Sequence, residues 1–211
     1  MSDHHSQSED TAPPLTAELL FRAYSQGFFP MAATRDSAHV DWYSPDPRSV
    51  LPLDGFICPR SLRQRIKQQR FEVRIDSAFP DVIKACASVR KGDSETWIND
   101  EIIQGFCELH EHGFTHCVEA WFDGRLVGGL YGMAIGGAFF GESMFHRPDL
   151  GGTDASKVCL AYLVEHLNNR GFQLLDTQIA NPHMAQFGII EIPREEYLYR
   201  LAHAIRLDTE F

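Results

Sequence analysis

The sequence predicts an α/β fold in which helices flank a mixed β-sheet, and three observations support this prediction. From Cys117 onward, apolar residues alternate with a period of two through three consecutive segments, which is typical of antiparallel strands joined by tight turns. A helix over about 154–169 follows, with its apolar residues on one stripe and Gly171 just past its end. A further strand at 172–179 precedes a last helix that begins at Pro193.

The beginning of the chain is predicted to contain one short helix. Thr16 is a good N-cap residue, and Gly27 and Pro30 are stop signals after it. The stretch 40–56 is rich in Pro and Asp, so we expect extended chain with turns there.

Three more elements are expected between this stretch and the alternating segments. A helix over about 60–70 leads into a strand at 71–75. Asp76 or Ser77 is suited to cap the next helix, which should run to about Ala87.

The domain organisation is predicted from the order of these elements. A helix over about 99–111, ended by Gly113, opens the second half of the chain. We expect a disordered tail at 1–14, a small N-terminal domain at 15–90, and a catalytic domain at 91–211. The candidate catalytic residues lie in this last part.

Composition limits the classes of function. A formal net charge of −10 over 211 residues argues against nucleic-acid binding across the whole surface, although a local basic patch stays possible. The five cysteines are an odd number without paired short spacing, which suits a reducing compartment better than a disulfide framework. No run is long and apolar enough to cross a membrane, and the N-terminus lacks the order of a signal peptide. A cytoplasmic protein is therefore expected.

A cluster of cysteines and histidines suggests a metal site at first sight. It contains Cys107, His110, His112, His116 and Cys117. On a helix, positions 110 and 112 point about 200° apart, and the spacing matches none of the usual Cys/His patterns. We therefore expect a solvated helix end with a buried Cys117, and no metal.

A glycine turn before the helix at 154 has two interpretations. Backbone N–H groups of Gly151, Gly152 and Thr153 could receive an anion, as the pyrophosphate loop of acyl-CoA-dependent N-acyltransferases does. Three residues separate Arg147 from Gly151, which is one residue more than that loop usually has. An ordinary helix N-cap with a flexible lead-in explains the turn equally well.

The segment 60–70 concentrates positive charge in an otherwise acidic chain. Four of its basic residues fall on one helical stripe, which is the arrangement that local phosphate contact requires. A solvated helix face is the alternative. The four residues are Arg60, Arg63, Lys67 and Arg70.

Polar groups interrupt two apolar strands. In "LLDTQI", Asp176 and Gln178 face the same side, and burying them requires hydrogen-bond partners. In "AFFGESMF", the alternation predicts that Glu142 shares a face with Phe140 and Met144. We expect the three polar residues to line one cleft.

Several longer motifs occur in order from about residue 19 to residue 200. Taken together they resemble the bacterial leucyl/phenylalanyl-tRNA–protein transferases, and the most specific are "WYSPDPR", "GESMF" and the Asp-x-Gln of the strand. The matching stretches are "LLFRAYSQGFFPM", "WYSPDPRSVLPL", "TWIND", "LVGGLYG", "GESMF", "DASKVCL", "LLDTQIANPH" and "EIPREEYL".

The resemblance implies an enzyme that moves Leu, Phe or, less readily, Met from a charged tRNA to the N-terminal Arg or Lys of a protein. The product enters the N-degron pathway of proteolysis. The implied catalytic domain is similar to the acyl-CoA N-acyltransferase (GNAT) fold, with a smaller N-terminal domain packed against it. No cofactor is implied, and we expect a monomer.

The resemblance also assigns residues. It implies that Asp176 and Gln178 are catalytic together with Glu142, and that Tyr24 and Trp97 hold the terminal adenosine. The pocket for the transferred side chain maps onto Leu130, Met144, Leu163, Leu167 and Leu175, and the basic segment onto the surface that meets the tRNA acceptor stem.

The chemistry agrees with these roles. An aminoacyl ester is already activated, so the enzyme must orient a neutral amine and stabilise an oxyanion, without a covalent nucleophile. We expect the Gln178 side-chain oxygen to accept a hydrogen bond from the amine, Asp176 to polarise that amide, and Glu142 to hold the cationic acceptor.

Departures from the family and alternative functions stay open. Met31 stands where some members have tryptophan, and Leu163 and Leu167 where some have phenylalanine, so the preference among Leu, Phe and Met is undecided. Residues 148–153 look like an insertion. The alternatives are an acyl-CoA-dependent N-acyltransferase and a non-catalytic RNA- or degron-binding relative.

Overall fold

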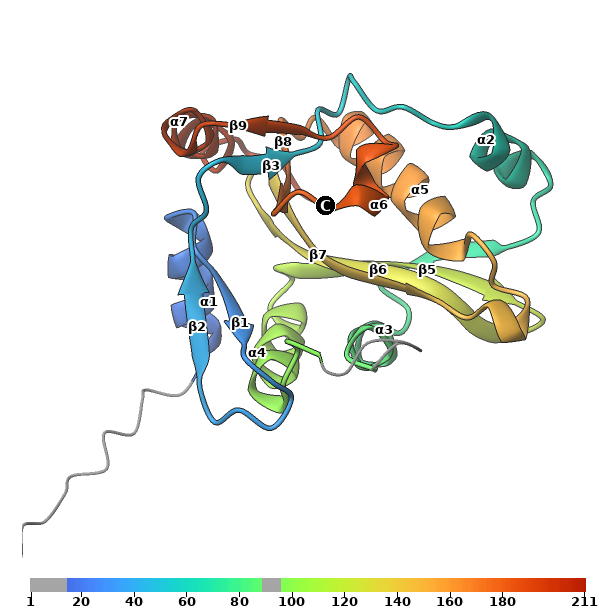
Figure 1. Ribbon diagram of the computed structural model, residues 1–211, viewed down its shortest axis with the longest axis horizontal. Coiled ribbons are helices and arrows are strands. Elements are labelled where there is room, and N and C mark those ends of the chain that lie inside the picture. The colour runs from blue at the N-terminus through green and yellow to red at the C-terminus, as the bar shows by residue number, and fades with distance from the viewer. Residues whose placement is uncertain (1–14, 89–95) are drawn as a thin grey trace, which may run out of the picture.

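A seven-stranded mixed sheet forms the centre of the computed structural model, which describes residues 15–88 and 96–211 (Figure 1). The strand order is β4-β5-β6-β7-β8-β3-β9, and a separate two-stranded sheet pairs β1 with β2. The strands are β1 (Phe29–Ala32), β2 (Val40–Tyr43), β3 (Arg48–Val50), β4 (Glu72–Ile75), β5 (Thr115–Phe122), β6 (Arg125–Ile135), β7 (Ala138–His146), β8 (Leu174–Gln178) and β9 (Ile190–Ile192).

Helices cover both faces of the large sheet. Figure 1 shows α3 and α4 below β5–β7 and α5 above them, with α1 beside the small sheet. We call the two sides the α3/α4 face and the α5 face. The helices are α1 (Ala17–Ser25), α2 (Arg60–Lys67), α3 (Phe79–Cys86), α4 (Asp100–Glu111), α5 (Ala155–Arg170), α6 (Pro182–Ala185) and α7 (Arg194–Ala204), with a 3₁₀ turn at Pro148–Leu150.

Each face of the sheet buries its own core. On the α3/α4 face, Phe79 and Phe106 pack against Tyr131 with their rings edge to face. On the α5 face, the leucines of α5 pack against alternate residues of β5–β7, for example Leu163 in one cluster with Leu130. The predicted mixed sheet flanked by helices is confirmed.

Local signals predicted several elements correctly. The antiparallel meander is confirmed as β5, β6 and β7. Thr16 caps α1, because its hydroxyl accepts a hydrogen bond from the Leu19 N–H at 3.2 Å. Gly171 follows α5 with a φ of 82°, a conformation that glycine adopts without the steric cost of a Cβ.

The cap predicted for α3 is wrong. Neither Asp76 nor Ser77 caps this helix; the carboxylate of Glu119 on β5 accepts from the backbone N–H groups of Ser77 (2.7 Å) and Ala78 (2.8 Å). Asp76 instead accepts from the Cys117 N–H at 2.8 Å. Because the N–H groups just before this helix are satisfied from a strand about 40 residues further along, no local pattern could reveal the contact.

The basic helix is shorter than predicted. α2 ends at Lys67, and Gln69 adopts a positive φ of 46°, which turns the chain away from the helix axis. Arg70 therefore lies outside the helical stripe that carries Arg60, Arg63 and Lys67.

Two predicted features fall on residues that the structure does not describe. The tail at 1–14 lies outside the described residues, and so does the domain boundary near residue 90. Strands β3 and β4, from the first half of the chain, hydrogen-bond within the large sheet. The division at residue 90 stays a prediction.

The cysteine–histidine cluster is spread over separate contacts. His110 Nδ1 lies 2.6 Å from the Thr115 carbonyl oxygen, and its ring stacks on Phe79 at 4.3 Å. His116 Nδ1 lies 2.7 Å from Asp76 Oδ2. Within residues 15–88 and 96–211, no three His, Cys, Asp or Glu side chains are placed to hold a metal, and no helix is long and apolar enough to span a bilayer.

Candidate functional site

An opening begins where β7 and β8 separate. The two strands are parallel partners through Phe140 and Asp176, and the pairing stops there. Just beyond, β7 bulges against β6: Gly132 pairs with Gly141 and Tyr131 pairs with Ser143, which leaves Glu142 as the extra residue. The bulge therefore places a carboxylate at the point where the sheet opens.

The bulge overturns one prediction. Phe140 packs in the core of the α3/α4 face, whereas Met144 packs against the core of the α5 face. The expectation that Glu142 shares one face with both residues is wrong, because the period of two holds only in a regular ladder. Glu142 lies between the two faces and reaches the opening from there.

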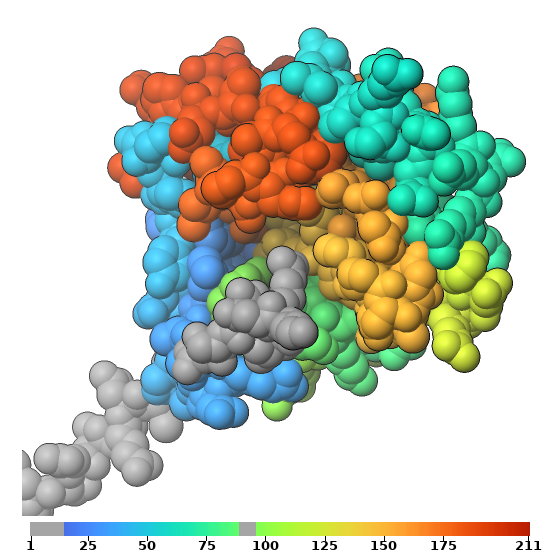
Figure 2. All heavy atoms as spheres, turned by 45° about the vertical axis from the view of Figure 1, so that its right-hand side comes forward, coloured from blue at the N-terminus to red at the C-terminus, as the bar shows by residue number. Residues whose placement is uncertain are grey.

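A cavity of about 670 Å³ extends from this opening to both faces of the sheet. In Figure 2, the surface recedes between the N-terminal segment in blue and α5 in gold. The apolar residues of the α5-face arm are Leu130, Met144, Leu160, Leu163, Leu175 and Met184. Those of the α3/α4-face arm are Phe29, Met31, Cys86, Trp97 and Tyr131.

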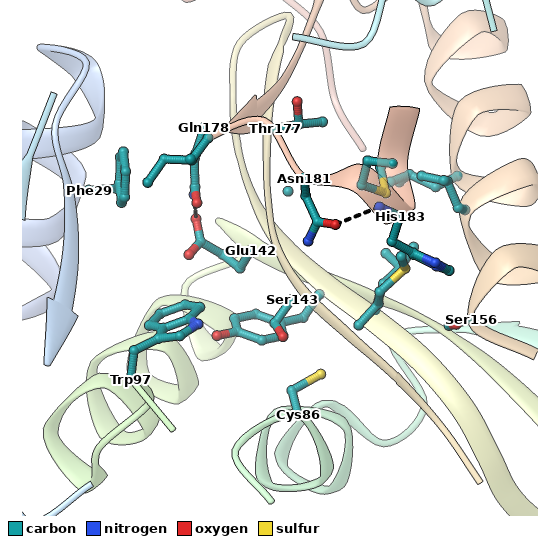
Figure 3. A pocket seen from close by; sticks show the side chains of 18 of the residues that line it. Phe29, Cys86, Trp97, Glu142, Ser143, Ser156, Thr177, Gln178, Asn181 and His183 are labelled. Carbon is teal, nitrogen blue, oxygen red and sulfur yellow. Dashed lines mark hydrogen bonds between the residues drawn. The ribbon is translucent and has the colours of Figure 1, made fainter. Parts of the chain in front are cut away.

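Glu142 and Gln178 face one another across the opening (Figure 3). Glu142 Oε1 accepts hydrogen bonds from Gln178 Nε2 and from the Tyr24 hydroxyl, both at 2.7 Å. Glu142 Oε2 is buried and has no partner among the described residues. Burial raises the pKa of Glu142 to about 8; hydrogen bonds from Tyr24 and Gln178 oppose this rise, and the charge of Asp176 adds to it.

Asp176 is buried behind this pair and fully satisfied. It accepts from Arg48 Nη2 at 2.6 Å and Nε at 3.0 Å, from the Tyr197 hydroxyl at 2.8 Å, and from the Gln178 backbone N–H at 2.8 Å. Arg48 also donates to the Gly27 carbonyl, and its guanidinium lies over the ring of Tyr197 at 4.4 Å. Asp176 therefore belongs to a buried ionic network, and the prediction that it lines the cleft together with Glu142 and Gln178 is wrong.

The backbone of Gln178 is held in an unusual conformation. Its φ is 64°, in the left-handed region that non-glycine residues rarely adopt. The bond from its N–H to Asp176 Oδ1 fixes this conformation, which turns the side chain toward Glu142. Within the described residues no group donates to the Gln178 amide oxygen, so that oxygen can accept a hydrogen bond from a bound molecule.

Sequence comparisons identify the family. The sequence model of "Leucyl/phenylalanyl-tRNA protein transferase" matches residues 50–202, and that of its N-terminal domain matches residues 14–46. The chain belongs to this family. Proteins named leucyl/phenylalanyl-tRNA–protein transferase are similar over most of their length: one from Paramagnetospirillum magneticum is 53% identical over 192 residues, 91% of this chain and 90% of that protein. One from Gloeobacter violaceus is 51% identical over 93% of this chain and 97% of that protein.

Solved structures are similar only at a distance. The match to a GCN5-related N-acetyltransferase-like protein from Streptococcus suis spans 92% of this chain and 64% of that protein's chain, with 15% identity and a TM-score of 0.33. The match to the C-terminal domain of a lysylphosphatidylglycerol synthetase from Agrobacterium fabrum spans 90% of this chain and 57% of that chain, with 13% identity and a TM-score of 0.43. The assignment to the transferase family rests on the sequences.

Most of the residues that the sequence analysis predicted for the site line the cavity. Glu142 and Gln178 form its centre, and Trp97 lines the α3/α4-face arm. The predicted side-chain pocket coincides with the α5-face arm at Leu130, Met144, Leu163 and Leu175.

Two residues predicted to contact substrate lie behind the cavity wall instead. Leu167 is fully buried in the core of the α5 face. Tyr24 is also fully buried, with its ring edge to face against Phe106 and Phe140, and its hydroxyl bound to Glu142. A ring without an exposed face offers no surface for a base, so the geometry favours a positioning role for Tyr24.

Sequence reasoning missed Arg48 and Tyr197, which hold Asp176. A weak signal existed for Arg48, because it ends the specific motif "WYSPDPR". Nothing in the sequence distinguished Tyr197 from the other core residues of α7.

The four basic residues predicted to meet tRNA are exposed and lie outside the cavity. α2 packs near α5 (Figure 1), and Arg60, Arg63 and Lys67 are exposed on it. The guanidinium of Arg70 lies over the Phe122 ring at 4.4 Å.

The glycine turn before α5 is not arranged as an anion site. The N–H groups of Gly151 and Gly152 already donate to carbonyls of Pro148 and Arg147. Asp154, at the N-terminus of α5, pairs with Lys157 at 2.9 Å and with Arg65 at 3.6 Å, so these two cations already have a carboxylate partner. The ordinary helix lead-in is the interpretation that fits.

Proposed function

We propose that this chain transfers Leu or Phe, and less readily Met, from a charged tRNA to the N-terminal Arg or Lys of an acceptor protein. The main observation in favour is the pair of Glu142 and Gln178, set where β7 and β8 separate and beside an apolar arm of the cavity. Membership of the transferase family supports the donor class.

The donor is proposed to lie across both arms. The aminoacyl side chain fits the apolar α5-face arm, where Leu130, Met144 and Leu163 exclude water. The terminal adenosine then lies near Trp97 and Met31 in the other arm. An unbranched Met31 in place of an aromatic ring supplies a flexible contact.

Gln178 is proposed to act on the attacking amine. Its Nε2 donates to Glu142, so its amide oxygen is oriented to accept a hydrogen bond from that amine. The amine nitrogen bonds to the ester carbonyl carbon, the ester C–O bond breaks, and the amine proton ends on the departing ribose oxygen. Orientation of the amine and stabilisation of the oxyanion are the main tasks.

The proposed role of Asp176 differs from the one expected from the sequence. Asp176 accepts from the backbone N–H of Gln178 and does not touch its side-chain amide, so it cannot polarise that amide directly. It is a positioning residue that fixes the left-handed backbone of Gln178. Glu142 is proposed to ionise when the cationic acceptor arrives, because a nearby positive charge lowers a carboxyl pKa.

The basic residues Arg60, Arg63, Lys67 and Arg70 are proposed to contact the phosphates of the tRNA acceptor stem. They offset locally the repulsion expected from a net charge of −10. Modification of proteins for the N-degron pathway, cytoplasmic localisation and a monomeric state stay predictions.

A transfer assay tests the proposal. The protein is incubated with radiolabelled Leu-tRNA and peptides that start with Arg, Lys, Asp or Glu, and we expect label on the Arg and Lys peptides alone. Label on the acidic peptides alone would overturn the acceptor assignment. Thermal stabilisation by acetyl-CoA but not by Leu-tRNA would instead support the acyl-CoA alternative.

A further inference from the structure

A second tyrosine next to Glu142 has no assigned role. Tyr131 on β6 is fully buried and pairs across the strands with Ser143, the neighbour of Glu142. Its ring is fixed edge to face by Phe79 and Phe106, at centroid distances of 5.9 and 5.4 Å. Tyr131 lines the cavity arm on the α3/α4 face, and its hydroxyl oxygen is buried without a partner among the described residues.

Comparison with the other fully buried tyrosines makes this hydroxyl unusual. The Tyr24 hydroxyl donates to Glu142, and the Tyr197 hydroxyl donates to Asp176. A buried hydroxyl without a partner destabilises a fold, and phenylalanine would fill the same space without that loss. The hydroxyl of Tyr131 is therefore placed for a molecule that enters the cavity.

A second unpartnered oxygen defines the chemistry of that molecule. Glu142 lines the same cavity, and its Oε2 is buried without a partner among the described residues. A carboxylate oxygen only accepts hydrogen bonds, and a phenol oxygen can also accept them. Two such oxygens on neighbouring strands suit a cation with several N–H donors.

The position of the two oxygens indicates that they face the side chain of the acceptor's first residue and not its α-amine. Gln178 and Glu142 Oε1 mark the place of the attacking amine, on the β8 side of Glu142. Tyr131 lies one strand further away, next to Ser143 on β7, and Cys86 of α3 lines the same end of the arm. In Figure 3, Ser143 and Cys86 lie on the side of Glu142 opposite to Gln178. A side chain that leads away from the amine would point in this direction.

We propose that the Tyr131 hydroxyl, together with Glu142 Oε2, binds the ammonium or guanidinium of the acceptor's N-terminal side chain. Tyr131 is then a specificity-determining residue that favours Lys and Arg over neutral residues. This inference rests on the proposed function, because it assumes an acceptor peptide in the cavity. The hydrogen bond forms only in the complex.

The test uses Tyr131→Phe in the full chain and two peptides of identical sequence that start with Lys or with norleucine, its uncharged counterpart. We expect the melting temperature of the free variant to equal or exceed that of the wild type. The preference for Lys over norleucine in kcat/KM should fall about tenfold, as for a lost hydrogen bond to a charged group. The KM for Leu-tRNA should not change. Tyr199→Phe, at a 79% exposed position, is the matched control and should behave as the wild type.

Three results would overturn the inference. A melting temperature several degrees lower would reveal a structural partner for the hydroxyl, such as a fixed water. An equal fall in kcat/KM for the Lys and norleucine peptides would show that the Tyr131 hydroxyl does not contact the side-chain cation. A raised KM for Leu-tRNA would show that the hydroxyl contacts the donor instead. If the wild type transfers to neither peptide, the proposed function fails, and calorimetric binding of the two peptides to both proteins still decides whether Tyr131 recognises the cation.

Discussion

Replacing Arg48 with methionine tests whether the buried ion pair of Arg48 and Asp176 stabilises the fold at the candidate site. Arg48 supplies two of the four hydrogen bonds to Asp176, and both side chains are at most 1% exposed. Methionine keeps an unbranched apolar side chain at this position, but it removes the charge, the N–H donors and the contacts of the guanidinium with the rings of Phe29 and Tyr197. Asp176 is then left as a buried carboxylate with only Tyr197 and Gln178 as donors.

The magnitude follows from the loss of one partner of a buried ion pair. Such a change lowers the free energy of unfolding by about 3–5 kcal/mol, because the remaining charge is neither solvated nor paired. For a chain of this size that corresponds to a fall in melting temperature of about 10 °C. Urea denaturation followed by tryptophan fluorescence measures the free energy directly.

Two controls make the result specific. Asp176→Asn in the Arg48→Met background removes the uncompensated charge and should restore a large part of the lost stability. Arg22→Met breaks an exposed pair with Glu18 and should change the free energy of unfolding by less than about 1 kcal/mol. A loss below about 1 kcal/mol for Arg48→Met would refute the reasoning that this pair holds the site.

Three further predictions concern single side chains. Burial raises the pKa of Glu142 from 4.5 to about 8, so between these pH values the folded state binds a proton that the unfolded state has released. The contribution of Glu142 to the free energy of unfolding is therefore complete below pH 4.5 and falls toward pH 8 by at most ~1.4 kcal/mol per pH unit. Glu142→Gln should remove this slope in melts from pH 5 to 8, and an unchanged slope would contradict the assignment. Tyr24→Phe should lower the free energy of unfolding by about 1 kcal/mol in urea titrations, since it deletes a bond to Glu142; no change would mean that this bond contributes nothing. Arg63→Glu should weaken tRNA binding and reduce its log–log salt slope by about 1, whereas Arg200→Glu on α7 should not; equal slopes would exclude α2 from the tRNA surface.

The fold was predictable where signals are local. Thr16 caps α1 and Gly171 ends α5 because the groups that each one satisfies lie within a few residues of it. The contact at the start of α3 was not predictable, because Glu119 reaches the N–H groups of Ser77 and Ala78 from β5. A helix end that is satisfied from a distant strand leaves no pattern at the helix itself.

In the candidate site, too, the residues with a local signal were predictable and the contacts between distant segments were not. Three polar residues in apolar strands were predicted to line one cleft, and two of them, Glu142 and Gln178, do so and lie 2.7 Å apart, whereas Asp176 is buried behind the cleft. The geometry of that meeting was not predicted, because one extra residue in β7 breaks the alternation and moves Met144 to the other face from Phe140. Arg48 was missed because its partner Asp176 is 128 residues away.

The central claim is that Gln178, oriented by Glu142, receives the attacking amine at the point where β7 and β8 separate. The most direct measurement is the single-turnover rate of peptide-bond formation from Leu-tRNA to a Lys-starting peptide, for the wild type and for Gln178→Ala. We expect the rate to fall about a hundredfold, as when one oriented hydrogen-bonding group is removed from an active site, with unchanged affinity for Leu-tRNA. A wild-type rate in the variant would contradict the claim.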